Sequence, residues 1–280
     1  MKYAGLIGYP VAHSLSPRMQ EAGFAALGIE ARYKLWETLA NELEVRVQSL
    51  RGSEMLGANV TIPYKEAVLP WLDEIDRQAA RIGAVNTIVN RAGRLVGYNT
   101  DAPGFLRALQ ERGGPGFLLR GRQAIVLGSG GAARGAAVAL LESQVNMLSI
   151  LGRTEAHVET LVAHLRQQSG ASYRVQGTQL NSPRARLLLA EAEVVVNTTS
   201  VGLKPADETE LIDARLLPTS SLVMDMIFNP PQTRLLRAAS ARGCLTLNGL
   251  SMLLYQGTLA LELWTDQRAP EEVMRAALDL

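Results

Sequence analysis

The chain lacks the features that mark several large classes of protein. It has 280 residues but one cysteine, Cys244, so no internal disulfide framework can form and a reducing compartment is favoured. Cys244 lies in a short apolar run and is expected to be buried. Neither sign of charge is in excess, because 28 lysines and arginines face 27 aspartates and glutamates, and the sequence has no basic block of the kind that nucleic-acid binders use. Binding of nucleic acid is therefore not expected.

Long apolar runs are also missing. No window approaches the roughly 20 apolar residues that a membrane span needs. The longest candidate, residues 124–141, is interrupted by five small residues at positions 128–132 and by Arg134. The N-terminal apolar stretch is too short for a signal peptide, and Pro10 interrupts it. With 47% apolar residues available for a core, we expect a soluble cytoplasmic protein.

Strand-like and helix-like runs alternate along the chain, which predicts an α/β fold with mainly parallel sheets. In the first part of the chain the predicted strands are residues 3–8, 32–37, 55–61, 84–90 and 95–98, and the predicted helices are residues 17–27 and 39–50. In the second part the predicted strands are residues 124–127, 147–151, 173–175, 193–197, 222–226 and 245–247, and the predicted helices are residues 102–111, 132–142, 155–168, 233–242 and 250–264. Ser16 is expected to cap the first helix, and Pro17 to lie in its first turn.

A glycine-rich loop in the second part has the pattern of a dinucleotide-binding turn. Residues 128–133, Gly-Ser-Gly-Gly-Ala-Ala, follow a predicted strand and open a predicted helix, which is the context that G-x-G-x-x-A requires. Gly128 permits the tight turn, Gly130 lets the backbone approach a pyrophosphate, and Ala133 allows close helix–strand packing. The free N–H groups of the helix N-terminus favour phosphate. We predict a dinucleotide site here, with a purely structural turn as the alternative.

The end of the next strand indicates which dinucleotide binds. An NAD site usually has an acidic residue at this point to bind the ribose 2′-hydroxyl, but here Gly152 is followed by Arg153. A guanidinium group fits a 2′-phosphate bidentately, which favours NADP. Glu155 lies close enough to weaken this preference, and an ordinary solvated charge is the alternative interpretation of Arg153.

Four polar clusters follow or end strands of the first part. They are the hydroxyl pair Ser14 and Ser16, residues 59–65 (Asn-Val-Thr-Ile-Pro-Tyr-Lys), residues 86–87 (Asn-Thr) and residues 99–101 (Asn-Thr-Asp). Open α/β sheets gather ligand groups at the ends of their strands. Two hydroxyls at positions i and i+2 beside a helix N-terminus can bind a carboxylate, unless Ser16 serves only as a helix cap.

Lys65 and Asp101 are the candidates for proton transfer. Lys65 is the only cation within the four clusters, and a lysine near a carboxylate, surrounded by amides and hydroxyls, can bind a polyhydroxylated molecule and move a proton. Beside a dinucleotide site, this chemistry predicts hydride transfer on an alcohol or ketone. The alternative is an ordinary surface ion pair.

Taken together, the motifs of this chain resemble those of the shikimate dehydrogenase family. They occur in the family's order, span nearly the whole chain, and are His-Ser-Leu-Ser-Pro at 13–17, Asn-Val-Thr-Ile-Pro-Tyr-Lys at 59–65, Gly-Ala-Val-Asn-Thr at 83–87, Gly-Tyr-Asn-Thr-Asp at 97–101, Gly-Ser-Gly-Gly-Ala-Ala-Arg at 128–134, Asn-Thr-Thr-Ser-Val-Gly at 197–202 and Gly-Leu-Ser-Met-Leu-Leu-Tyr-Gln at 249–256.

The resemblance implies a fold and a reaction. A substrate-binding α/β domain, residues 1–101, would be completed by C-terminal helices in residues 249–280, and a Rossmann-type NADP-binding domain would occupy residues 102–248. The reaction would be the reversible NADPH-dependent reduction of 3-dehydroshikimate to shikimate, on the route to chorismate and aromatic amino acids. We expect the protein to bind no metal, nucleic acid or membrane. A homodimer is left open.

The resemblance also implies roles for single residues. Lys65 and Asp101 would be the catalytic pair. The substrate would be bound by Ser14, Ser16, Thr61, Lys65, Asn86, Asp101 and Gln256. The cofactor would be bound by Gly128, Ser129, Gly130, Gly131, Ala132, Ala133, Arg153, Thr154, Thr198, Ser200, Met226 and Gly249.

Three departures from the family pattern keep an altered substrate or NAD use open, as in an enzyme that acts on quinate or aminoshikimate. Phe228 replaces the tyrosine of Asp-x-x-Tyr-x-Pro, His157 stands where a second basic residue often follows Arg153, and residues 20–21 are Gln-Glu in place of His-Asn. A second alternative is a paralogue without catalysis that senses the ring acid. The presence of both Lys65 and Asp101 argues against a sensor, because sensing needs no proton-transfer pair.

Overall fold

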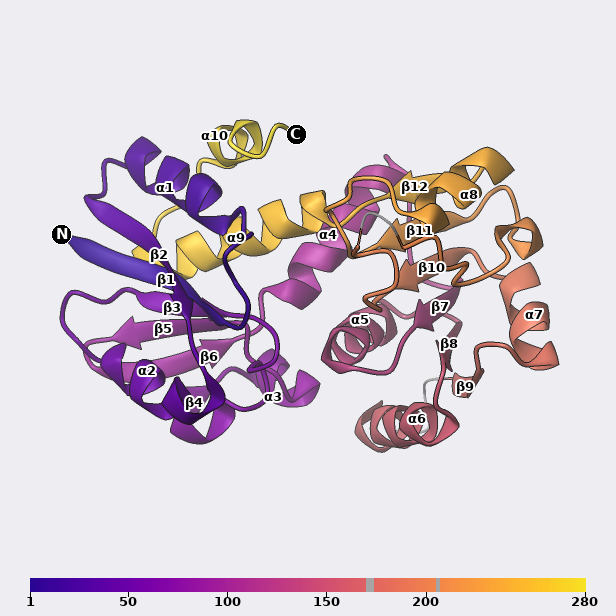
Figure 1. The fold of residues 1–280 in the computed structure, drawn as a ribbon, viewed down its shortest axis with the longest axis horizontal. Coiled ribbons are helices and arrows are strands. Elements are labelled where there is room, and N and C mark those ends of the chain that lie inside the picture. Colours follow the sequence, from indigo (N-terminus) through magenta and orange to yellow (C-terminus); the bar gives the residue numbers. More distant parts are fainter. Residues whose placement is uncertain (170–173, 205–206) are drawn as a thin grey trace. The chain divides into compact units, whose positions relative to one another are not determined.

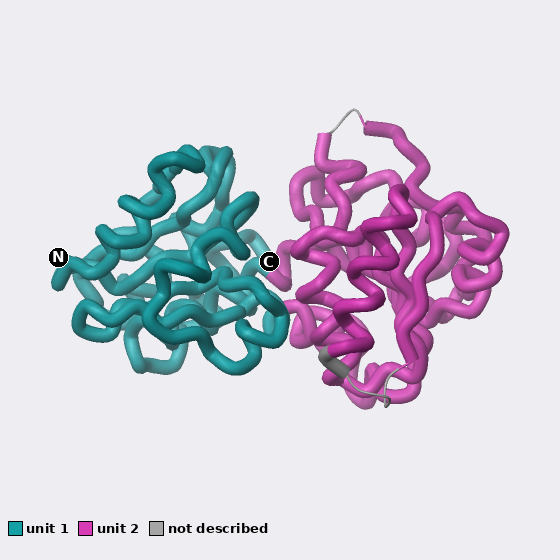
Figure 2. Tube along the Cα trace, turned by 90° about the horizontal axis from the view of Figure 1, so that it is seen from below, with its two compact units in different colours: residues 1–104, 253–280 teal, residues 105–252 magenta. Residues whose placement is uncertain are grey.

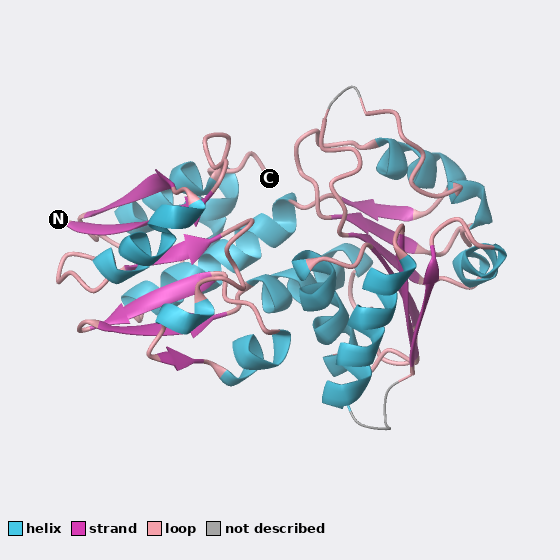
Figure 3. Cartoon of the chain, turned by 60° about the horizontal axis from the view of Figure 1, so that its bottom comes forward, coloured by secondary structure: helices cyan, strands magenta, loops and turns pink. Residues whose placement is uncertain are grey.

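The computed structural model describes residues 1–169, 174–204 and 207–280, which form two compact units (Figure 2). Unit 1 consists of Met1–Gly104 together with Leu253–Leu280, and unit 2 is Phe105–Met252. The chain enters unit 2 within helix α4 (Asp101–Gly113) and returns to unit 1 within helix α9 (Leu250–Thr265). Each unit has a six-stranded sheet flanked by helices (Figures 1 and 3), which confirms the predicted α/β class with two domains.

The sheet of unit 1 is mixed, with strand order β2-β1-β3-β5-β6-β4. β1 runs parallel to β2 and β3, whereas β5 runs antiparallel to β3 and forms a hairpin with β6. The strands are β1 (Lys2–Gly8), β2 (Ala31–Glu37), β3 (Gly57–Val60), β4 (Glu74–Ile75), β5 (Thr87–Arg91) and β6 (Arg94–Tyr98). The remaining helices of this unit are α1 (Ser16–Ala26), η1 (Ala40–Glu42), α2 (Leu43–Ser49), η2 (Leu69–Trp71), α3 (Arg77–Ile82) and α10 (Glu271–Ala276).

The two faces of this sheet differ in character. Side chains alternate along each strand, so Trp36, Ala58 and Ile88 share one face, where they form an apolar core with α2. Asn59 pairs with Thr87 across β3 and β5, and both residues belong to the opposite face. Buried polar residues on one face of a sheet are unusual in a core that serves only stability, and they mark this face as the functional one.

The sheet of unit 2 is entirely parallel, with strand order β12-β11-β10-β7-β8-β9. Its strands are β7 (Gln123–Leu127), β8 (Met147–Gly152), β9 (Val175–Gln179), β10 (Val194–Asn197), β11 (Leu222–Asp225) and β12 (Leu245–Leu247). Its other helices are α5 (Gly131–Glu142), α6 (Glu155–Ser169), α7 (Pro183–Ala190), η4 (Ala214–Leu216) and α8 (Arg234–Arg242). The first strand of the unit, β7, lies inside the sheet with β8 on one side and β10 on the other, which is the doubly wound Rossmann arrangement.

Most predicted elements are present, and the differences have local causes. The short helices α3, α7 and α10 were not predicted, because six to eight residues give little periodicity. Tyr173, where the strand now seen as β9 was predicted to begin, lies outside the described residues. Cys244 is buried as expected. Within the described part of the chain, no helix has the length and hydropathy required to cross a membrane.

One prediction about the first helix was wrong. Ser16 is not its N-cap: α1 begins at Ser16 itself, and the cap position is taken by Leu15, whose backbone is already helical and whose side chain makes no capping bond. Pro17 lies in the first turn as predicted. The hydroxyl of Ser16 is therefore not used to cap the helix, which removes the structural alternative for this residue.

Candidate active site

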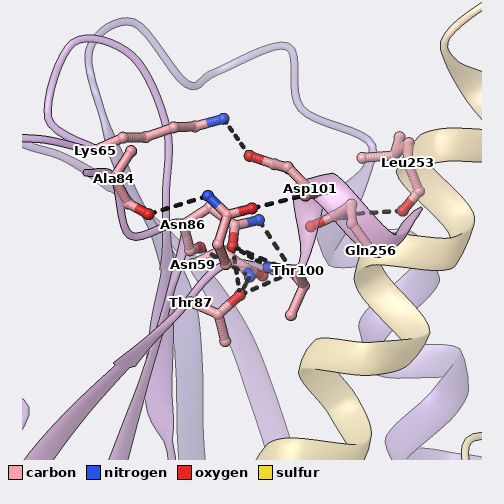
Figure 4. A network of polar contacts seen from close by, with 11 residues as sticks. Asn59, Lys65, Ala84, Asn86, Thr87, Thr100, Asp101, Leu253 and Gln256 are labelled. Carbon is pink, nitrogen blue, oxygen red and sulfur yellow. Dashed lines mark hydrogen bonds and ion pairs between the residues drawn. The ribbon is translucent and has the colours of Figure 1, made fainter. Parts of the chain in front are cut away.

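Lys65 and Asp101 meet in unit 1, with Lys65 Nζ 2.6 Å from Asp101 Oδ2 (Figure 4). The side chains are 28% and 21% exposed, so the pair is only partly open to solvent. Two contacts hold the turn that carries the lysine. The hydroxyl of buried Tyr64 donates to the backbone oxygen of Thr38 at 2.7 Å, and the backbone oxygen of Lys65 accepts from Val85 N at 2.8 Å. The ammonium group is thus presented from a fixed backbone.

Asp101 is fixed by the residues just before it. It is the first residue of α4, where the free N–H groups and dipole of a helix favour a negative charge. Asn99 is buried and ties this helix start to the segment before β5, because its Nδ2 donates to Ala84 O at 3.0 Å and its Oδ1 accepts from Ala102 N at 3.1 Å. The backbone that carries the Asp101 carboxylate is therefore held in place by the fold itself.

The side-chain amide of Asn86 has an orientation that its neighbours determine. Its Oδ1 accepts from the backbone N–H of Thr100 at 2.7 Å, and its Nδ2 donates to Thr100 Oγ1 at 3.0 Å (Figure 4). A backbone N–H can only donate, so the oxygen of the amide must face it. These bonds connect Asn86 to the residue directly before Asp101.

The other predicted substrate residues also lie in unit 1, on segments that end β1 and β3 and on α9. Ser14 Oγ accepts from Ser16 N at 3.2 Å, so the two serines form one compact turn. Thr61 packs closely on Gly8, where an added Cβ would come within 2.3 Å of Thr61 Cγ2, so only glycine fits at the end of β1. Gln256 is buried on α9, and its Nε2 donates to Leu253 O at 2.8 Å.

The predicted cofactor residues lie in unit 2, after the carboxyl ends of β7, β8, β10, β11 and β12. Gly128 has φ +114°, and a Cβ there would come within 2.7 Å of Thr198 Oγ1, so both the turn and its close neighbour require glycine. Thr198 in turn donates through Oγ1 to Leu127 O at 2.7 Å. A Cβ on Gly130 would meet nothing within 4 Å, which leaves room for a phosphate above the N-terminus of α5.

The packing around Gly152, at the end of β8, disfavours an acidic side chain. A Cβ on Gly152 would come within 2.7 Å of Val158 Cγ2, so an aspartate or glutamate would require the Val158 side chain to shift. Arg153 and His157 are exposed beside it, and the backbone oxygen of Arg153 accepts from Gln179 Nε2 at 3.2 Å. The packing thus disfavours an acidic residue of the NAD type at position 152. The next residue is Arg153, whose side chain is exposed.

The last two predicted cofactor residues touch each other. A Cβ on Gly249 would come within 2.1 Å of the backbone oxygen of Met226, so glycine is required for the two segments to meet. Met226 N donates to Asn197 O at 3.0 Å, which brings this pair beside the loop that carries Thr198 and Ser200.

Asp225 was missed as a functional candidate, although its motif was noted for Phe228. It is fully buried at the end of β11, and it accepts from Asn197 Nδ2 at 3.0 Å, Ile227 N at 3.0 Å and Thr233 Oγ1 at 2.7 Å. Burial raises the pKa of the Asp225 carboxyl, and the three hydrogen bonds oppose this only in part. An aspartate that ends a wholly apolar strand was the signal in the sequence.

Asn197 connects Asp225 to the loop of residues 198–202, which carries two predicted cofactor residues. Its Oδ1 accepts from both the backbone N–H of Thr199 at 2.9 Å and the hydroxyl of Thr199 at 2.8 Å. The pair Asp225 and Asn197 therefore shapes residues 198–202 as well as the segment after β11. No set of three or more His, Cys, Asp or Glu side chains placed to bind a metal occurs in the described ranges 1–169, 174–204 and 207–280.

Comparison with known proteins gives a family match along most of the chain. Three family models match: the shikimate dehydrogenase substrate binding domain at residues 6–88, shikimate / quinate 5-dehydrogenase at residues 114–226, and the shikimate 5′-dehydrogenase C-terminal domain at residues 249–278. A protein of Symbiobacterium thermophilum named shikimate dehydrogenase (NADP(+)) is 46% identical over 98% of this chain and 92% of its own length.

Solved structures agree with this match. The shikimate 5-dehydrogenase of Thermus thermophilus, in complex with NADP(H) and shikimate, is 38% identical with a TM-score of 0.86, and the alignment covers 100% of this chain and 99% of that one. A quinate dehydrogenase of Corynebacterium glutamicum in complex with NAD is 33% identical with a TM-score of 0.90, covering 100% and 99% of the two chains. The likeness to both structures extends over both units.

Proposed function

Since the chain belongs to the shikimate dehydrogenase family, we propose that it reduces 3-dehydroshikimate reversibly to shikimate with NADPH, and that Lys65 and Asp101 handle the proton. The chain is an oxidoreductase, and NADP is its cofactor. The single observation that carries the assignment of residues is the half-buried ion pair of 2.6 Å between Lys65 and Asp101, surrounded by oriented amides. Unit 1 is proposed as the substrate-binding domain and unit 2 as the NADP-binding domain.

The chemistry of the pair fits this reaction. Bound NADPH supplies a hydride to the ketone carbon. As negative charge grows on the ketone oxygen, the ammonium group of Lys65 stabilises that charge and donates the proton. Asp101 holds the ammonium group in place and accepts from a neighbouring ring hydroxyl. In the direction of shikimate oxidation, Lys65 accepts the proton from the hydroxyl instead.

The remaining polar residues of unit 1 are proposed to recognise the ring acid. Ser14 and Ser16 bind the carboxylate, which is supported by their shared turn at the start of α1 and by the absence of a capping role for Ser16. Thr61, Asn86 and Gln256 bind the ring hydroxyls. The orientation of the Asn86 amide supports a donor N–H toward the substrate.

We expect Arg153→Ala to reduce the preference for NADP. The guanidinium group pairs with the 2′-phosphate, so its removal should raise the KM for NADP⁺ by about tenfold or more while leaving the KM for NAD⁺ within about twofold. The measurement is kcat/KM for both cofactors with saturating shikimate. Arg120→Ala is the matched control, because Arg120 is another exposed arginine of unit 2 that lies outside the predicted cofactor set. Equal use of NADP⁺ and NAD⁺ by the wild type would contradict the assignment.

The choice of ring acid is tested most directly by one assay. Reduction of NADP⁺ is followed with shikimate and quinate side by side, and shikimate is expected to be the better substrate by kcat/KM. The half-buried Phe228, which lacks the phenolic hydroxyl of the family pattern, is the residue in the sequence that most favours a different outcome. Binding of shikimate without any reduction of NADP⁺ would instead favour a sensor.

A cytoplasmic location completes the proposal, and whether the chain forms a homodimer is left to measurement. A single cysteine, buried in unit 2, suits a reducing compartment. The oligomeric state is measured by size-exclusion chromatography with light scattering, and a monomer mass of 30.3 kDa would reject the dimer.

A further inference from the structure

Five polar side chains are buried together on the functional face of the unit 1 sheet. Their exposed fractions are 5% or less, and they are Tyr33, Asn59, Asn86, Thr87 and Thr100. Buried polar groups weaken a fold unless every group finds a partner, so a cluster of this size needs a reason beyond packing. Figure 4 shows Asn59, Asn86, Thr87 and Thr100 gathered beneath Lys65 and Asp101.

The hydrogen bonds of this cluster run from donor to acceptor in one order, which starts at the hydroxyl of Tyr33. A phenol has one proton, which Tyr33 Oη donates to Asn59 Oδ1 at 2.8 Å. The oxygen of the Asn59 amide is thereby fixed toward Tyr33, and its Nδ2 donates to Thr87 Oγ1 at 3.0 Å and to Asn86 O at 3.3 Å. Without the phenol, the oxygen of the Asn59 amide would lose its donor, and the longer bond from Nδ2 to Asn86 O would have to hold the amide in place.

The same series of hydrogen bonds continues to the predicted substrate residue Asn86. Thr87 Oγ1 receives the Asn59 N–H and donates to Asn86 Oδ1 at 3.2 Å. The oxygen of the Asn86 amide is thus held on two sides, by Thr87 and by Thr100 N. One N–H of its nitrogen donates to Thr100 Oγ1, and the second N–H is the group that can donate to a ligand. Thr100 directly precedes Asp101, so the same cluster also supports the catalytic carboxylate.

Burial raises the pKa of the Tyr33 phenol, so the phenol keeps the proton that it donates to Asn59. Tyr33 therefore reaches the hydroxyl subsite through Asn59.

We propose that Tyr33 is a positioning residue for substrate recognition, which orients the donor face of Asn86 through Asn59 and Thr87. The proposal rests on the proposed function, because that function assigns Asn86 to the substrate. Tyr33 does not touch the substrate in this scheme. It fixes which groups donate and which accept before the ring acid binds.

The test is the affinity for shikimate of Tyr33→Phe, measured by isothermal titration calorimetry. We expect the Kd for shikimate to rise about tenfold, because a donor misaligned in a buried subsite weakens binding by roughly this factor. The KM for NADP⁺ should stay within about twofold, since its predicted site lies in unit 2. The matched control is Tyr255→Phe, which alters a second buried tyrosine of unit 1 whose Oη accepts from Arg275 Nη2 at 2.8 Å.

A double variant separates positioning from a general loss of stability. Asn59→Leu has nearly the same shape, and together with Tyr33→Phe it removes both partners of the bond, which is milder for folding than removing one. If Tyr33 acts on Asn86 through Asn59, the double variant should bind shikimate no more weakly than Asn59→Leu alone, within about twofold. Equal Kd values for wild type and Tyr33→Phe, with a Tm lowered as in the control, would show a structural role and overturn the proposal.

Binding and turnover distinguish this proposal from the proposed function. A wild type that binds shikimate but does not reduce NADP⁺ would reject the dehydrogenase, and the Tyr33 comparison by calorimetry would still decide the positioning role. A wild type that binds no shikimate would reject both.

Discussion

Lys65→Ala is expected to lower kcat for shikimate oxidation by about 10²–10⁴-fold, the usual contribution of a general acid–base group. The ammonium group both stabilises the charge on the reacting oxygen and exchanges the proton with it, and no other cation lies within the four polar clusters of the sequence. Asp101 remains in place in this variant. Initial rates of NADP⁺ reduction over a range of shikimate concentrations measure the effect.

The control for this variant is Lys34→Ala. Lys34 is an exposed lysine of the same unit that lies over the ring of Tyr3 at 4.4 Å, so the substitution removes an equal charge without touching the pair. Lys34→Ala should keep kcat within about twofold. If Lys65→Ala raised KM and left kcat intact, Lys65 would bind substrate without transferring the proton.

Asp101 is expected to act together with Lys65 on the same proton. In the double variant Lys65→Ala/Asp101→Ala, the losses in kcat are expected not to multiply, because residues that act together on one proton are strongly non-additive. Fully multiplicative losses would show that the 2.6 Å contact joins two residues with separate tasks.

Much of the architecture could be predicted from the sequence because its signals are local. The glycine loop between β7 and α5 is a case in point: its spacing, the apolar strand before it and the small residues after it all lie within about twenty residues. Gly152 was read as a missing acid, and the structure adds the reason, since Val158 occupies the space that a side chain would need. Such short-range requirements are visible in a sequence.

What could not be predicted depends on contacts between distant residues. Tyr33 and Asn59 are separated by 26 positions and meet only because β1 places β2 and β3 on its two sides. In the sequence Tyr33 is an ordinary aromatic residue of a strand. Ser16 was expected to cap a helix because serine often does, but α1 begins at Ser16 itself, so its hydroxyl does not cap the helix.

Asp225→Ala is expected to give the largest loss of stability, about 3 kcal/mol in the free energy of unfolding. The substitution leaves Asn197 Nδ2, Ile227 N and Thr233 Oγ1 without their acceptor in a buried place, and each such loss costs about 1–3 kcal/mol before water enters. Urea unfolding measures the change. The KM for NADP⁺ should rise as well, because Asn197 would no longer hold the loop of residues 198–202.

The control for Asp225→Ala is Asp213→Ala in the same unit. Asp213 also accepts from a backbone N–H, that of Arg215 at 3.0 Å, but its ion pair with Arg215 is solvent-exposed on the arginine side. Its removal should cost about 1 kcal/mol or less and leave the KM for NADP⁺ unchanged. Asp213 is the N-cap of η4. Equal losses in the two variants would show that the buried hydrogen bonds of Asp225 stabilise the fold no more than this single exposed N-cap does.

The pH dependence of stability gives an independent test of the buried carboxyl through Asp225→Asn, which cannot titrate. Burial raises the pKa of Asp225, so the folded chain holds this proton more tightly than the unfolded chain. Its contribution to the free energy of unfolding is therefore fully present below the unfolded pKa of about 3.9 and is lost as pH rises through the raised value. The stability advantage of the wild type over Asp225→Asn should shrink in urea unfolding as pH rises from about 4 to 7. An advantage that grew with pH would mean that the three hydrogen bonds outweigh burial and that the pKa is lowered.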